Sequence, residues 1–264
     1  MPTNDLMTGK WKRSPKMTAE DLTRGIVGIL QQDGRMAGTG FVVHHGMVAT
    51  CAHVVGLAGA GPDSTVHLIF HTTKGQQEAK VVPEYWRDPE AEDIAILRLE
   101  DPLPNGIKPV LIGRSPQKDG HRFSTFGYPP VRDKDGMYGY GTIGNLVPTG
   151  AAGFMLQLAT KEVTAGFSGA PILDTDTGRV VGMVSTITPP DRYGRLQETT
   201  FVTPTETLKL VCPTLSISPD AVEEDKPLWD PEASPMSPEG VMGPLGPLGP
   251  LGSMGPKGWW GTSG

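Results

Sequence analysis

Short apolar segments, interrupted by polar residues and bounded by Gly, Pro, Asp or Asn, recur at close spacing between residues 26 and 203. Segments of this length and spacing predict β-strands joined by tight turns, which is typical of an all-β barrel or sandwich. Six expected strands lie between residues 26 and 99, and six lie between residues 122 and 203. They are Ile26–Leu30, Gly40–His44, Met47–Thr50, Val66–Phe70, Ala79–Val82, Ile94–Leu99, Arg122–Phe126, Tyr138–Leu146, Phe154–Leu158, Ala170–Leu173, Arg179–Thr186 and Thr200–Thr203.

The stretches between these segments predict loops and one helix. Glycine and proline mark loops at residues 56–62 and 101–106, and residues 113–120 are expected to cross between the two halves. Asp174–Gly178 has the acidic spacing of a calcium loop, but its glycine is at the fifth position and no glutamate closes it, so it predicts a hairpin turn. Thr203 is expected to cap a short helix that begins at Pro204 and ends near Cys212.

The composition changes along the chain and suggests four regions. We expect residues 1–20 to be a flexible leader, 21–213 a folded domain, and 214–239 an acidic, proline-rich linker. From Gly240 every third residue is glycine, which is a collagen-type period. Eight triplets would make a very short triple helix, so we expect residues 240–264 to be disordered. A trimer formed through this tail is the alternative.

The charge and the length of the apolar runs argue against nucleic-acid and membrane partners. The formal net charge is −6, but seven of the 29 acidic residues and only two lysines lie in residues 219–264, so the rest of the chain is close to neutral. No basic patch favours nucleic acid, and no apolar run has the length of a membrane span or a signal peptide. Two cysteines are too few for a disulfide framework. We therefore expect a cytoplasmic protein without nucleic-acid or membrane partners.

The stretch Thr164–Pro171 places Ser168 between Gly166 and Gly169. Gly166 permits a tight turn, and the backbone N–H groups of Gly166 and Ser168 could then point at one spot beside the hydroxyl. That arrangement is an oxyanion hole, which stabilises the negative charge of a tetrahedral intermediate. A serine hydroxyl becomes a good nucleophile only when a neighbouring base removes its proton. The motif therefore predicts that the chain also supplies a histidine and an acid.

A histidine and an aspartate occur upstream in recognisable surroundings. His53 follows an apolar segment within residues 48–55, and Asp93 opens the apolar run 94–97; Asp88 and Asp101 are nearby alternatives. With the glycine-flanked Ser168, these residues resemble the trypsin-like serine proteases, in which the order of the triad is His, Asp, Ser. The resemblance covers residues 21–211, including the motif at 38–43 and the strand motifs at 178–185 and 201–204, and it is strongest to intracellular bacterial trypsin-like domains.

The resemblance implies a fold of two six-stranded antiparallel β-barrels with a short C-terminal helix. It further implies a serine endopeptidase that acts on protein or peptide substrates through an acyl-enzyme, with no cofactor or metal. Bacterial domains of this kind are often attached to sensor modules, so a regulatory sensor protein is a conceivable partner. The alternatives are a catalytically silent peptide-binding module and a display protein assembled through the Gly-X-Y tail.

The resemblance also places four residues around the primary substrate pocket, and they give conflicting indications. Glu162 would form the floor, where an acid selects Lys or Arg. Ser185, Ile187 and Thr199 would line the walls, and the bulk of Ile187 and Thr199 would make the pocket shallow. Because a buried, unpaired carboxylate is costly, we expect the enzyme to prefer a small uncharged residue before the scissile bond.

Activation by proteolysis is not expected. In the trypsin mechanism a new N-terminal ammonium pairs with an aspartate immediately before the nucleophile, but here that residue is Phe167. We expect Phe167 to pack into apolar surface behind the loop, and Ile26 to belong to the first strand although Arg24 precedes it as a possible cleavage site. Cys51, two residues before His53, is expected to be a small buried residue rather than a redox switch.

Overall fold

The structure is a computed structural model that describes residues 16–44, 46–116, 120–148, 153–187 and 199–218. The greater part of the expected leader, most of the linker and the whole Gly-X-Y tail lie outside the described residues. Within these residues, none of the helices has the length and apolar composition needed to cross a membrane.

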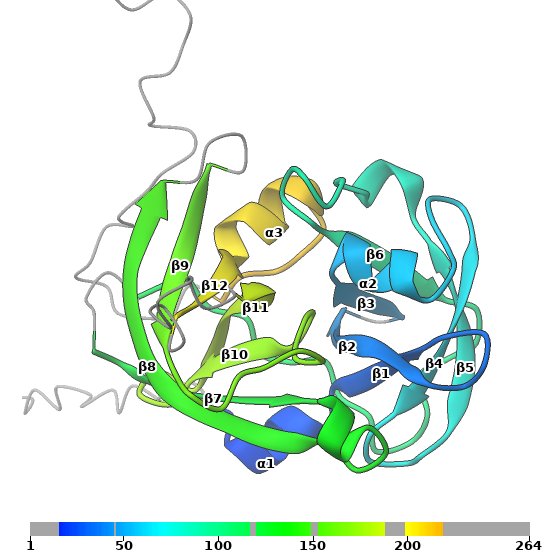
Figure 1. The fold of residues 1–264 in the computed structure, drawn as a ribbon, viewed down its shortest axis with the longest axis horizontal. Helices are drawn as coiled ribbons and strands as arrows, with labels where there is room; N and C mark the ends of the chain where they lie inside the picture. Colours follow the sequence, from blue (N-terminus) through cyan, green and yellow to red (C-terminus); the bar gives the residue numbers. More distant parts are fainter. Residues whose placement is uncertain (1–15, 45, 117–119, 149–152, 188–198, 219–264) are drawn as a thin grey trace, which may run out of the picture. The chain divides into compact units, whose positions relative to one another are not determined.

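The strands form two closed, antiparallel, six-stranded barrels, shown in blue to cyan and in green to yellow in Figure 1. In the first barrel the order is β1-β2-β3-β6-β5-β4, and in the second it is β10-β11-β12-β9-β8-β7. The strands are β1 (Ile26–Leu30), β2 (Met36–His44), β3 (Met47–Thr50), β4 (Thr65–Phe70), β5 (Gln76–Val81), β6 (Ala95–Leu99), β7 (Arg122–Gly127), β8 (Met137–Pro148), β9 (Phe154–Ala159), β10 (Pro171–Asp174), β11 (Arg179–Ile187) and β12 (Thr199–Pro204). The predicted double-barrel fold is confirmed, and each expected strand overlaps one of these.

Side chains that alternate along the strands fill the interior of the barrels. In β4, Val66, Leu68 and Phe70 are buried while the residues between them are more exposed. The second barrel is filled in the same way around fully or almost fully buried rings, Phe123 and Phe167. Because every strand has two hydrogen-bonded neighbours, neither barrel leaves an open sheet edge.

The structure corrects the expected course of the chain around His53. The strand expected at Met47–Thr50 is β3, but no helix was expected before the loop at residues 56–62. The chain instead forms the short helix α2 (Ala52–Leu57), which contains His53 and overlaps the start of that expected loop. Its six residues complete less than two turns, so its buried residues show no helical period in the sequence.

Both ends of the folded domain extend further than expected. Helix α1 (Ala19–Thr23) begins with a capping box, in which Thr18 and Asp21 exchange side-chain-to-backbone hydrogen bonds. Met17 is buried, so the flexible leader cannot extend to residue 20. At the other end Leu215 is buried and the Ser218 N–H donates to the Ile112 carbonyl at 2.8 Å, so residues 214–218 pack against the domain rather than beginning the linker.

The C-terminal helix and the expected hairpin are confirmed with adjusted details. Helix α3 (Thr205–Val211) begins one residue later than predicted, because Pro204 is extended and closes β12, and Thr203 therefore does not cap it. Asp174 closes the β10–β11 hairpin: its carbonyl accepts the Gly178 N–H and its carboxylate accepts the Asp176 N–H, both at 2.8 Å. Two short 3-10 helices, η1 (Pro83–Tyr85) and η2 (Pro130–Arg132), complete the elements.

Candidate active site

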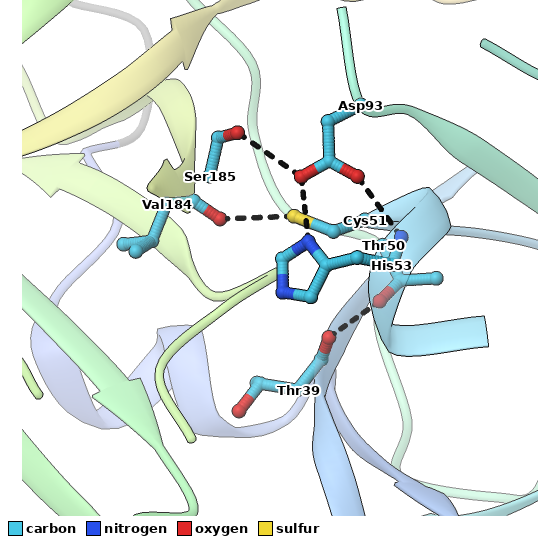
Figure 2. Close-up of polar contacts among 7 residues, drawn as sticks. All are labelled: Thr39, Thr50, Cys51, His53, Asp93, Val184 and Ser185. Atoms are coloured by element: carbon cyan, nitrogen blue, oxygen red, sulfur yellow. Dashed lines mark hydrogen bonds and ion pairs between the residues drawn. The ribbon is translucent and has the colours of Figure 1, made fainter. Parts of the chain in front are cut away.

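His53 and Asp93 form a hydrogen-bonded pair at the ends of two neighbouring elements of the first barrel. The carboxylate of Asp93 accepts the backbone N–H of His53 at 2.9 Å with one oxygen and lies 2.7 Å from Nδ1 of the imidazole with the other. Figure 2 shows this double contact. When Nδ1 carries the proton that Asp93 accepts, Nε2 is left with a free lone pair. The pair therefore orients a neutral imidazole as a base.

Asp93 reaches His53 through an unusual backbone conformation. Its φ is +53°, in the left-handed region that Asp and Asn tolerate better than other non-glycine residues. The two alternative acids do not take part: Asp101 is exposed, and Asp88 is exposed and accepts a hydrogen bond from the Trp86 indole. Among the three aspartates, only Asp93 contacts the imidazole.

Two further residues, Ser185 and Cys51, lie beside the pair, and the sequence did not predict the contacts that they make there. Ser185 is buried in β11, and its hydroxyl donates to the same Asp93 oxygen that faces His53, at 3.2 Å. Cys51 is buried beneath the pair, and its thiol donates to the Val184 carbonyl (Figure 2). Burial, and secondarily the charge of Asp93, raise the pKa of the Cys51 thiol well above its ordinary value. Cys51 is therefore a neutral packing residue, as expected.

The loop before Ser168 presents two unused backbone donors. Gly166 has φ +93° in a turn closed by a 3.1 Å hydrogen bond from the Phe167 N–H to the Thr164 carbonyl. Phe167 between them is completely buried in the second barrel, which confirms its expected packing. Within the described residues, the N–H groups of Gly166 and Ser168 donate to no other group. The loop thus has the two free donors that an oxyanion hole requires.

One cavity brings Ser168 and His53 together. Its volume is about 460 Å³, and its lining includes Ser168, Gly166 and Ala165 from the second barrel and His53 and Leu57 from α2. Within the described residues, the hydrogen-bond network joins His53 to Asp93 but does not include the Ser168 hydroxyl. The base and the candidate nucleophile thus face the same space without being hydrogen-bonded.

Three of the four expected pocket residues, Glu162, Ser185 and Thr199, are not among the residues that line this cavity. Glu162 is exposed, and its carboxylate accepts the Tyr140 N–H at 3.1 Å, so the cost of a buried, unpaired acid does not apply to it. Ser185 faces Asp93, and Thr199 is half-buried in β12 opposite Ala159. Ile187 pairs with Thr200 through its backbone, and its side chain lies outside the described part of the structure.

A second histidine–aspartate pair has a structural explanation. His121 Nδ1 lies 2.8 Å from an oxygen of the buried Asp174, and with Asp176 these residues could in principle hold a metal ion. The other Asp174 oxygen accepts the N–H groups of Asp176 and Thr177. Both oxygens are thus already hydrogen-bonded, one to His121 and the other within the hairpin, and the cluster does not indicate a metal site.

Comparisons with known proteins agree with this fold. The family model described as a trypsin-like peptidase domain matches residues 38–183. No curated protein sequence matches the chain significantly. Among solved structures, the Rv3671c protease from M. tuberculosis in its active form has a TM-score of 0.59 at 22% identity over 80% of this chain and 95% of its own. The HtrA-type protease AlgW with a decapeptide has a TM-score of 0.55 at 17% identity, over 74% and 66%.

Proposed function

Since the chain belongs to the trypsin-like peptidase family, whose substrates are peptides, we propose that it is a serine endopeptidase with the triad Ser168, His53 and Asp93. The observation that carries the proposal is the His53–Asp93 pair, with its bonds of 2.9 and 2.7 Å, in one cavity with Ser168 and the free N–H groups of its loop. Each part alone has other uses, but an oriented base, an exposed hydroxyl and paired donors together suit acyl transfer.

In the proposed reaction, Nε2 of His53 removes the proton from Ser168 as the hydroxyl oxygen attacks the scissile carbonyl. The oxygen of that carbonyl becomes negative and accepts the N–H groups of Gly166 and Ser168. His53 then gives its proton to the leaving amine, and water, activated by the same imidazole, releases the acyl group from Ser168. Asp93 keeps the imidazole in one orientation and stabilises its charged form.

The missing hydrogen bond between Ser168 and His53 is the one observation that favours the alternative, a silent peptide-binding module. In enzymes without bound substrate, catalytic hydrogen bonds are often long or poorly aligned and tighten only in the complex. The structure without substrate is therefore compatible with catalysis, and the reactivity of Ser168 distinguishes the peptidase from the peptide-binding module.

A fluorophosphonate probe distinguishes the two functions because it reacts only with an activated serine. We expect it to label Ser168 in the wild type, and Ser168→Ala and His53→Ala to abolish labelling. Ser64→Ala, which changes a serine in the loop before β4, is the control and should label at the wild-type rate. A folded wild type that is not labelled, or equal labelling of Ser168→Ala, would show that the triad is silent or misassigned.

A further inference from the structure

Thr39 lies in the middle of β2, opposite Gly28 of β1, and is completely buried. Its carbonyl accepts the hydroxyl of Thr50 at 2.7 Å, a bond between neighbouring strands of the first barrel (Figure 2). Its other polar groups turn towards the second barrel. Thr39 is therefore fixed in one barrel and free to contact the other.

Within the described residues, the hydrogen bonds that Thr39 makes to the second barrel all involve the loop at residues 164–168 or Tyr128, whose N–H also donates to that loop. The Thr39 hydroxyl donates to the Gly166 carbonyl at 2.8 Å, and the Thr39 N–H donates to the Ser168 carbonyl at 2.9 Å. The same hydroxyl oxygen accepts the Tyr128 N–H at 3.3 Å. One residue thus contacts both residues whose N–H groups are the candidate oxyanion donors.

Gly166 needs such a restraint because glycine moves readily between backbone conformations. The Gly166 N–H belongs to the peptide that joins Ala165 to Gly166, and the Gly166 carbonyl to the peptide that joins Gly166 to Phe167, so a change in the Gly166 dihedral angles would turn the two groups relative to each other. The Thr39 hydroxyl holds the carbonyl on one side, while buried Phe167 anchors the next residue. Without that hydroxyl, the Gly166 carbonyl keeps only the longer 3.3 Å bond from the Tyr128 N–H.

We propose that Thr39 is a positioning residue for the oxyanion hole: its hydroxyl keeps Gly166 in the conformation that points the free N–H at the developing negative charge. The proposal rests on the proposed peptidase function. It also means that the first barrel, which provides His53 and Asp93, fixes the loop of the second barrel that provides the donors.

The test compares Thr39→Val, which keeps the shape but removes the hydroxyl, with Thr39→Ser, which keeps the hydroxyl. The readouts are the rate of fluorophosphonate labelling and kcat and KM for a p-nitrophenyl ester in the full-length protein. Loss of an oxyanion donor slows catalysis by about 100- to 1000-fold. For a donor that is misplaced in part of the molecules we expect about a 10- to 100-fold fall in kcat with Thr39→Val, little change in KM, and recovery to within about 3-fold with Thr39→Ser.

The matched control is Thr205→Val, because Thr205 is also fully buried and its hydroxyl donates to the carbonyl of Gly113 at 2.7 Å, away from the cavity. It should lower the melting temperature without lowering kcat. If Thr39→Val does not fold, Thr39→Ala takes its place with the same expected loss. Wild-type kcat in a folded Thr39→Val or Thr39→Ala, or a loss in Thr39→Ser as large as in Thr39→Val, would overturn the proposal. An unreactive wild type would instead refute the proposed function, so the two failures are distinguishable.

Discussion

At the scale of single residues, Asp93 is held by more groups than its pairing with His53 alone requires. Its carboxylate accepts bonds from the His53 N–H, the His53 ring and the Ser185 hydroxyl. Its left-handed backbone turns the carboxylate towards these donors, and such conformations occur where the surroundings enforce them. Ser185 is therefore expected to help to orient the triad although it does not touch the reacting atoms.

Replacing Ser185 tests this role. A hydrogen bond to a charged group contributes about 1.5–3 kcal/mol, and only part of that is lost as misorientation of Asp93. We expect Ser185→Ala to slow fluorophosphonate labelling of Ser168 by about 3- to 10-fold, since 1.4 kcal/mol corresponds to tenfold. The matched control is Ser124→Ala, because Ser124 is buried but its hydroxyl has no partner among the described residues. Equal rates for Ser185→Ala and the control would show that the contact is incidental.

Residues of the site differ in how far the sequence predicts them. Ser168, His53 and Asp93 are marked by local motifs, because the backbone around each has special requirements that glycine, alanine or a following apolar strand satisfies. Thr39 and Ser185 carry no such signal. Their partners, Gly166 and Asp93, are 127 and 92 residues away, so only the closure of the barrels reveals the contacts.

At the scale of elements, the strands and the C-terminal helix α3 were predictable, and helices α1 and α2 were not. Each strand is bounded by turn residues and alternates in burial, so a few residues suffice to recognise it. Helices α1 and α2 have five and six residues, which is too short for a helical period.

The contact between β4 and the loop after β7 links the barrels and predicts a pH dependence. His71 Nδ1 lies 3.1 Å from the Tyr128 hydroxyl, and its ring packs 4.3 Å from Phe126 between centroids. Burial, with a smaller effect of Lys74 and against the opposing effect of Asp135, lowers the pKa of His71 from 6.5 to about 4. The folded protein therefore binds a proton at His71 less readily than the unfolded chain does.

The contribution of His71 to the free energy of unfolding is therefore most favourable above pH 6.5, where its ring is neutral in both states. It falls as the pH drops towards 4, because the unfolded chain binds the proton first. We expect the free energy of unfolding, measured with urea, to fall more steeply over this range in the wild type than in His71→Leu. His67→Leu is the control, because the His67 side chain is 60% exposed on β4, the strand that directly precedes His71. Parallel pH profiles for wild type and His71→Leu would show that His71 titrates normally.

At the scale of the whole molecule, the two barrels form the site without any sign that the chain must be cut first. Ile26 is buried in β1 and paired with Phe41 of β2, so it is an interior strand residue and not a terminus waiting to be released. Phe167, in the place of the aspartate that receives the new terminus in trypsins, already fills the second barrel.

Mutation of the possible cleavage site tests this interpretation. We expect Arg24→Ala to keep the wild-type N-terminal mass and to label with fluorophosphonate at the wild-type rate. Loss of labelling in Arg24→Ala, together with its recovery in a chain that begins at Ile26, would show instead that the protein is a zymogen.

The most direct test of the central claim is to ask whether the protein cuts peptide bonds within chains. A proteome-derived peptide library is incubated with the full-length wild type and with Ser168→Ala, and new termini are identified by mass spectrometry. The proposed function predicts internal cleavages with the wild type and none with Ser168→Ala. If the bulk of Ile187 and Thr199 narrows the primary substrate pocket, as the resemblance implies, small uncharged residues should precede the cut. A wild type whose Ser168 reacts with the fluorophosphonate but which produces no new termini would contradict the assignment as an endopeptidase.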